Sequence, residues 1–78
     1  MKQIDYERTG RLLRNYRELH QMSLREAASK VYISHDILFR YEKATRKPSL
    51  ENMILLADLY GKNVEDLIVF TNDRKETE

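Results

Sequence analysis

The residues of this chain whose types and spacing could do chemistry are cations rather than nucleophiles or metal ligands. Lys43, Arg46 and Lys47 fall within five residues of one another, and Pro48 ends the loop that carries the last two. Cations grouped in this way are suited to binding a polyanion. The 78 residues include only two histidines, in different segments, and no cysteine. We therefore expect no enzyme activity, no metal site, no cofactor and no disulfide.

Charge is divided unevenly along the chain. Residues 1–47 hold eleven Lys/Arg against six Asp/Glu, and residues 48–78 hold three against seven, although the formal net charge is +1. This asymmetry is expected of a protein with one face that attracts a polyanion, although charged helix surfaces also serve solubility. No apolar run approaches the roughly 18–20 residues that span a bilayer, and the chain's start lacks the apolar core of a signal peptide. We therefore expect a cytoplasmic protein with no membrane contact.

Apolar residues recur at helical spacing, which predicts an all-α domain of five short helices over residues 1–70. Polar capping residues indicate where the helices begin, namely at Asp5, Ser23, Ser34, Ser49 and Asn63. The expected core face of the first helix is Leu12, Leu13, Tyr16 and Leu19, and that of the fourth is Leu50, Met53, Ile54, Ala57 and Leu59. Residues 71–78 contain no apolar side chain, so we expect a disordered polar tail.

The second and third expected helices are separated only by Tyr32, Ile33 and Ser34. So short a connection rules out antiparallel packing over any length and fits a steep crossing, the geometry of a helix-turn-helix. Such a unit presents its second helix to the major groove of DNA. A generic two-helix turn would explain the spacing equally well.

From about Ile4 to Ile68 the chain resembles the Cro/repressor type (XRE family) of helix-turn-helix domain, found in lambdoid phage repressors and small bacterial regulators. The motifs that carry the resemblance are Leu13-Arg14-x-x-Arg17, Ser23-x-x-Glu26-Ala27-Ala28, Ile33-Ser34, Leu38, Tyr41-Glu42, Arg46-Lys47-Pro48-Ser49-Leu50, Ala57-x-x-Tyr60-Gly61 and Glu65-Asp66-Leu67. The resemblance implies a lambda-repressor-like fold and a bacterial or phage-encoded regulator that binds double-stranded DNA. It also implies an ion pair between Arg17 and Glu42 that fixes the third helix, the alternative being two separate solvated charges.

The family's DNA-contacting positions fall on two groups of residues. Base contacts are implied for Ser34, His35, Asp36, Ile37 and Arg40, and backbone contacts for Ser23, Lys43, Thr45, Arg46 and Lys47. Arg40 could donate to guanine O6 and N7, and Ile37 could touch a thymine methyl group. Asp36 could accept from cytosine N4 or only help to cap its helix. His35 and the loop cations could instead be solvated surface residues.

Four positions depart from the family's pattern. Tyr32 and Ala44 stand where glycine is usual, so each is expected to bear the cost of a left-handed backbone unless the turn is built differently. Leu24 replaces a frequent glutamine, which removes one polar contact to DNA. Ala27 replaces a large aliphatic residue, so its neighbours must fill the core there.

Two apolar groups bear on the choice of function. Ile68, Val69 and Phe70, expected at the end of the fifth helix, are a candidate dimer contact or else core packing. Tyr32 and Phe39 could form an exposed patch for a partner protein, or Phe39 could fold back over its own helix. The leading hypothesis is a homodimeric, sequence-specific transcriptional regulator, a repressor, on a dyad operator. The alternative is a protein-interaction module with weak or no specific DNA binding.

Overall fold

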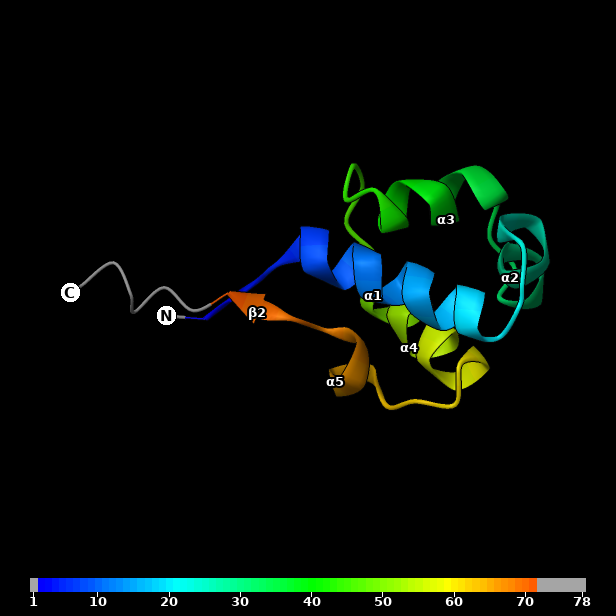
Figure 1. Cartoon of the computed structure of the whole chain (residues 1–78). Coiled ribbons are helices and arrows are strands. Elements are labelled where there is room, and N and C mark those ends of the chain that lie inside the picture. Colours follow the sequence, from blue (N-terminus) through cyan, green and yellow to red (C-terminus); the bar gives the residue numbers. More distant parts are fainter. Residues whose placement is uncertain (1, 72–78) are drawn as a thin grey trace.

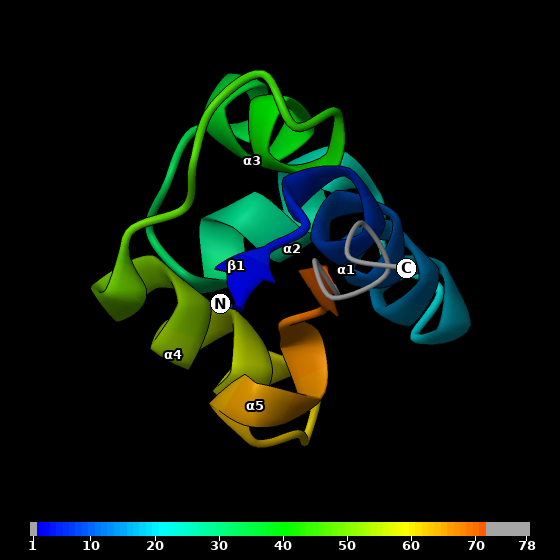
Figure 2. The ribbon, with the colours of Figure 1, turned by 90° about the vertical axis from the view of Figure 1, so that its left-hand side faces the viewer.

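Five helices and one two-stranded sheet make up the fold in the computed structural model, which describes residues 2–71. Along the chain they are β1 (Gln3–Ile4), α1 (Tyr6–Leu19), α2 (Leu24–Lys30), α3 (His35–Glu42), α4 (Leu50–Leu59), α5 (Val64–Leu67) and β2 (Phe70–Thr71). The predicted helical fold is confirmed, whereas the sheet was not predicted. α1 runs through the middle, with α3 on one side of it and α4 and α5 on the other (Figures 1 and 2).

Each helix begins at its expected capping residue. Side-chain oxygens accept backbone N–H bonds of 3.0 to 3.1 Å at the first four helices, from Arg8 to Asp5, Glu26 to Ser23, Ile37 to Ser34 and Asn52 to Ser49. At α5 the N–H of Asn63 donates to the Asp66 carboxylate at 3.0 Å. These bonds satisfy donors that no helical carbonyl can reach. Because each cap depends only on residues within one helical turn, the cap positions could be predicted from the sequence.

The core lies where the inner faces of the helices meet, and it differs from the expected one in two places. On α1, Leu19 is 75% exposed, whereas Thr9 and Gly10 are buried with Leu13. Leu19 stands about 120° around the helix from Leu13, outside the face that neighbouring elements cover. The prediction that Leu19 belongs to the core is therefore wrong.

On α4, Leu50 and Ile54 are 68% and 49% exposed, so their predicted core role is also wrong. Leu56 of α4 and Tyr60, which follows the helix, are buried instead, together with the expected Met53 and Ala57. Because α4 has apolar residues on most of its circumference, its own pattern does not say which side is covered. The position of its neighbours decides this.

The chain after Leu67 is extended rather than helical, which corrects the expectation for Ile68, Val69 and Phe70. β2 pairs antiparallel with β1, with Phe70 opposite Ile4. Two hydrogen bonds hold the approach to this sheet: Asp5 N–H to the Val69 carbonyl at 2.7 Å, and Val69 N–H to Thr9 Oγ1 at 3.0 Å. Thr71, expected in the polar tail, belongs to β2. The rest of the expected tail lies outside the described residues.

Candidate nucleic-acid interface

α2 and α3 form the turn-connected pair that the spacing predicted. The chain reverses at Tyr32, whose φ is +64°, and the Ile33 N–H donates to the Ala28 carbonyl at 3.1 Å. Ala27 and Ala28 of α2 are buried, and the half-buried Leu24 packs against the same core. α3 lies at the outside of the molecule (Figure 1).

The outward side of α3 carries most of the residues expected to contact bases. His35, Asp36 and Arg40 are exposed, whereas Ile37 is half-buried and packs against the core. The Ser34 hydroxyl caps the helix by accepting from the Ile37 N–H. Asp36 does not supply that bond, and its carboxylate instead accepts from Arg40 Nε at 2.9 Å. The structure thus brings these side chains to one surface and links two of them.

The residues expected to contact the phosphate backbone precede α2 or follow α3 in the chain. Ser23 caps α2, and Lys43, Thr45 and Arg46 follow the last turn of α3, all of them exposed. Lys47 is also exposed, but its ammonium nitrogen lies 5.4 Å from the centre of the Tyr6 ring, on α1. A cation over an aromatic face is held there only weakly at an exposed site, so Lys47 remains able to move to a phosphate.

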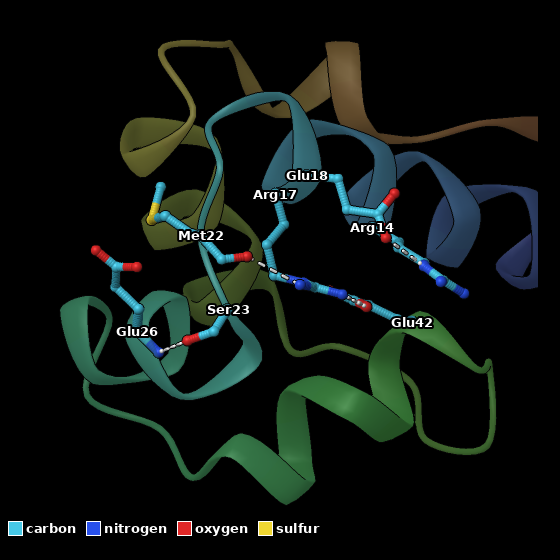
Figure 3. A network of polar contacts seen from close by, with 7 residues as sticks. All are labelled: Arg14, Arg17, Glu18, Met22, Ser23, Glu26 and Glu42. Atoms are coloured by element: carbon cyan, nitrogen blue, oxygen red, sulfur yellow. Dashed lines mark hydrogen bonds and ion pairs between the residues drawn. The ribbon is translucent and has the colours of Figure 1, made fainter.

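Arg17 and Glu42 form a buried ion pair behind α3 (Figure 3). Arg17 Nε and Nη2 donate to the two carboxylate oxygens at 2.8 and 3.0 Å, and Nη1 donates to the Met22 carbonyl at 2.9 Å. The side chains are only 11% and 3% exposed. The hydrogen bonds to Glu42 raise the pKa of the Arg17 guanidinium. One side chain thereby ties α1 to the end of α3 and to the loop that enters α2, which fixes the pose of α3.

Two further contacts behind α3 were missed by sequence reasoning. The backbone of α1 at Gly10 lies so close to the end of α3 that a Cβ there would stand 2.5 Å from the Glu42 carbonyl oxygen. Asn52 of α4 donates from Nδ2 to the Tyr41 hydroxyl at 2.8 Å. A glycine inside a helical pattern is a recognisable signal of close approach, so Gly10 could have been found. Nothing local to Asn52 indicates its partner.

Tyr32 and Ala44, which stand where the family usually has glycine, adopt the left-handed backbone conformation that glycine would adopt there. Tyr32 and Ala44 have φ of +64° and +62°, so both turns are built as expected and both residues bear the conformational cost. The Tyr32 side chain is 89% exposed and Phe39, on α3, is 43% exposed. Phe39 therefore does not fold away completely, and Lys43 Nζ lies 5.7 Å from its ring centre.

Neither a metal site nor a membrane-spanning helix is found within residues 2–71. This part of the chain holds no cluster of three or more His, Cys, Asp or Glu side chains that could bind a metal ion. None of its helices combines the length and the apolar character needed to cross a membrane.

The turn after α2, the exposed side of α3 and the cations beyond it together define a helix-turn-helix domain. A family model described as helix-turn-helix matches residues 13–67. The chain belongs to this family, in its Cro/repressor (XRE) type.

Relatives in sequence carry matching names. The chain is 31% identical over 61 residues to YobD of Bacillus subtilis, an uncharacterized HTH-type transcriptional regulator, and the match covers 78% of this chain and 54% of the relative. It is 30% identical, again over 78% of its length, to the uncharacterized HTH-type transcriptional regulator MJ0272 of Methanocaldococcus jannaschii, of which it covers 92%. The chain thus spans about half of one relative and nearly all of the other.

Solved structures agree on the fold. The clp gene regulator ClgR of Corynebacterium glutamicum superposes with a TM-score of 0.75 at 27% identity, over 80% of this chain and 66% of that one. The restriction-modification controller protein C.AhdI of Aeromonas hydrophila superposes with a TM-score of 0.77 at 24% identity, over 81% and 96%. The second likeness concerns the fold alone.

Proposed function

We propose that this protein is a sequence-specific DNA-binding transcriptional regulator that inserts α3 into the major groove. The helix-turn-helix family and the relatives named as transcriptional regulators support the class of DNA-binding regulator. The observation that carries the finer proposal is the exposed side of α3, which presents His35, Asp36 and Arg40 and continues into exposed cations at Lys43 and Arg46. In this arrangement the helix supplies the base contacts and the loop beyond it the phosphate contacts.

Individual roles follow from chemistry and position. Arg40 would donate to guanine, and His35 and Ser34, at the first turn of α3, would lie nearest the base edges. Ile37 would reach a thymine methyl only with the part of its side chain that the core leaves free. Ser23, Lys43, Thr45, Arg46 and Lys47 would hold the sugar–phosphate backbone on either side.

The protein would act as a homodimer on a dyad operator, since one such domain buries too little surface for tight binding alone. Phe70, 45% exposed beside the half-buried Ile68 and Val69, is the proposed contact. An apolar cleft of about 140 Å³, lined partly by Ile4, Leu50 and Ile68, shares Ile68 with this group and could accept an apolar side chain of the second copy. A dimer on its operator would exclude other proteins from the same DNA, which favours repression. The proposed location is the cytoplasm, for a protein that is bacterial or phage-encoded.

Selection from a random duplex pool tests the proposal, followed by mobility shifts of the selected and of a scrambled duplex at two salt concentrations. A DNA-binding regulator should enrich a motif with dyad symmetry, and its affinity should fall steeply with salt as counterions are released. Sedimentation of the protein with the duplex should give two chains per site. Enrichment of no motif contradicts the proposal.

The second candidate is a protein-interaction module, and the exposure of Tyr32 and Phe39 on the surface that would meet DNA favours it. Exposed aromatic residues are frequent anchors of protein contacts. This function predicts that Tyr32→Ser with Phe39→Ser leaves binding to DNA unchanged. A regulator that uses α3 should lose affinity for its selected site in the Phe39→Ser variant.

A further inference from the structure

We propose that Asp36 is a positioning residue: it holds the guanidinium of Arg40 so that its terminal nitrogens contact a guanine. This inference rests on the proposed function. It assigns guanine as the base that Arg40 contacts and gives Asp36 the role of orienting Arg40. Both side chains lie on the exposed side of α3, 61% and 52% exposed for Asp36 and Arg40.

The contact with Asp36 uses only one of the three guanidinium nitrogens of Arg40. Arg40 donates through Nε to Asp36 Oδ2 at 2.9 Å, and within residues 2–71 neither Nη1 nor Nη2 has a partner. A guanidinium offers its donors in a fixed planar fork. With Nε occupied, the pair of terminal nitrogens remains, and two parallel N–H donors match O6 and N7 of guanine.

The Asp36–Arg40 contact contributes little to stability, and its proposed effect is to orient the Arg40 side chain before DNA binds. An exposed ion pair four residues apart on a helix stabilises it only slightly, because water screens both charges. A free arginine, however, samples many rotamers and must give up that freedom when it binds a base. A side chain already held in one orientation loses less conformational entropy when it binds. Because it also cannot turn easily to suit another base, its discrimination among bases is sharper.

The negative charge of Asp36 would by itself oppose binding to DNA. Asp36 is the only exposed acidic residue of α3, since Glu42 is buried against Arg17. An unpaired carboxylate facing phosphates would weaken binding to every sequence. Paired with Arg40, it keeps that repulsion small while it orients the guanidinium.

The test measures affinity for the selected operator and for the three variants of the base pair at which the protein selects guanine. Arg40→Ala should lower the preference for guanine by about 5- to 100-fold. Asp36→Ala should lower it by about 2- to 5-fold, the range that an exposed ion pair can supply, and, because a negative charge is removed, should leave affinity for random DNA equal or higher. Asp36→Asn, whose Oδ1 still accepts a hydrogen bond, should lie between Asp36→Ala and the wild type. Opposite changes in preference and in general affinity are not expected from a residue that only stabilises the helix.

α1 offers a matched control. Arg14 Nε donates to Glu18 Oε2, also at 2.9 Å and also four residues apart on an exposed helix side. Glu18→Ala removes the same kind of contact and the same charge, and should leave the preference for guanine unchanged. Thermal melting of each variant checks that the fold is retained.

The double variant completes the test. With Arg40→Ala already present, Asp36→Ala should cause no further loss of base preference. The positioning role is overturned if Asp36→Ala keeps the wild-type preference, if its effect persists without Arg40, or if Glu18→Ala shows the same loss. If the wild-type protein selects no sequence at all, the proposed function itself fails.

Discussion

Gly10 of α1 faces the last carbonyl groups of α3 directly: a Cβ at Gly10 would stand 2.5 Å from the Glu42 oxygen and 2.7 Å from the Tyr41 oxygen. The same end of α3 is held by the Arg17–Glu42 ion pair. α1 therefore fixes the helix proposed to enter DNA in two ways, by backbone contact and by charge. The orientation of α3 depends on a residue that has no side chain.

Gly10→Ala should destabilise the protein by about 1–3 kcal/mol, although alanine favours a helix by about 1 kcal/mol over glycine. The added methyl group meets backbone atoms, which cannot move aside as a flexible side chain would. Urea unfolding measures the difference. Asn15→Ala, at an exposed position of the same helix, is the control and should leave stability equal or slightly higher. A Gly10→Ala protein as stable as the wild type would contradict the close packing.

Glu42→Gln should cost about 3 kcal/mol of stability, because it leaves the Arg17 guanidinium, 11% exposed, without its charged partner. The double change of Arg17→Met with Glu42→Leu should recover most of that loss, since neither residue then buries a charge. Urea unfolding gives both values. The recovered double variant should still select its DNA motif less sharply if the ion pair sets the pose of α3.

Ala44→Gly and Tyr32→Gly should each stabilise the protein by about 0.5–1 kcal/mol, because glycine adopts a positive φ without steric cost. Gly61 provides the converse control. Its φ is +69° and an added Cβ would meet nothing within 4 Å, so Gly61→Ala isolates the backbone cost and should destabilise by a similar amount. Thermal unfolding of the three variants checks the signs. A stabilising Gly61→Ala would refute the argument for all three.

Tyr60→Phe should leave stability at pH 7 unchanged or raise it by about 1 kcal/mol, because the buried Tyr60 hydroxyl has no hydrogen-bond partner within residues 2–71. Burial also raises the pKa of the Tyr60 phenol above its ordinary value of about 10. The folded state then holds the proton more tightly than the unfolded state. Stability is fully present below pH 10 and falls above it, by up to about 1.4 kcal/mol per pH unit from this group.

The difference between wild type and Tyr60→Phe isolates that titration from those of the other tyrosines and the lysines. Unfolding free energies from pH 8 to the highest pH at which the protein stays folded should show the wild type losing stability faster above pH 10. Parallel curves would show that the pKa of Tyr60 is the same in the folded and unfolded states.

Features that depend on neighbouring residues could be predicted from the sequence, whereas features that depend on residues far apart in the chain could not. The caps at Ser23, Ser34 and Ser49 were predictable, because a hydroxyl and the N–H three residues later lie in one turn. The extended path of Val69 was not, because it depends on Thr9, sixty residues away in the chain. The same holds for the exposure of Leu50, which only the placement of neighbouring elements decides.

The candidate site divides in the same way. The resemblance to the family supplied the Arg17–Glu42 pair, which joins residues 25 positions apart. The Asp36–Arg40 contact could have been inferred from its four-residue spacing on one helix. Base and phosphate contacts themselves remain predictions, because they depend on a partner that the chain alone does not contain.

Lys47→Ala should weaken binding to selected and random duplexes about equally and lower the slope of log affinity against log salt by roughly one, as loss of one phosphate contact requires. In the structure Lys47 Nζ lies 5.4 Å from the Tyr6 ring centre, so it must leave the ring to reach DNA, at a cost of about 0.5–1 kcal/mol. Tyr6→Leu removes that competing contact and should therefore tighten binding slightly at low salt. Arg46→Ala, at the exposed neighbouring position, should lower the slope by a similar amount. If Arg46→Ala lowers the slope and Lys47→Ala does not, Lys47 stays on Tyr6 in the complex, and its role is to join the loop to α1 rather than to hold DNA.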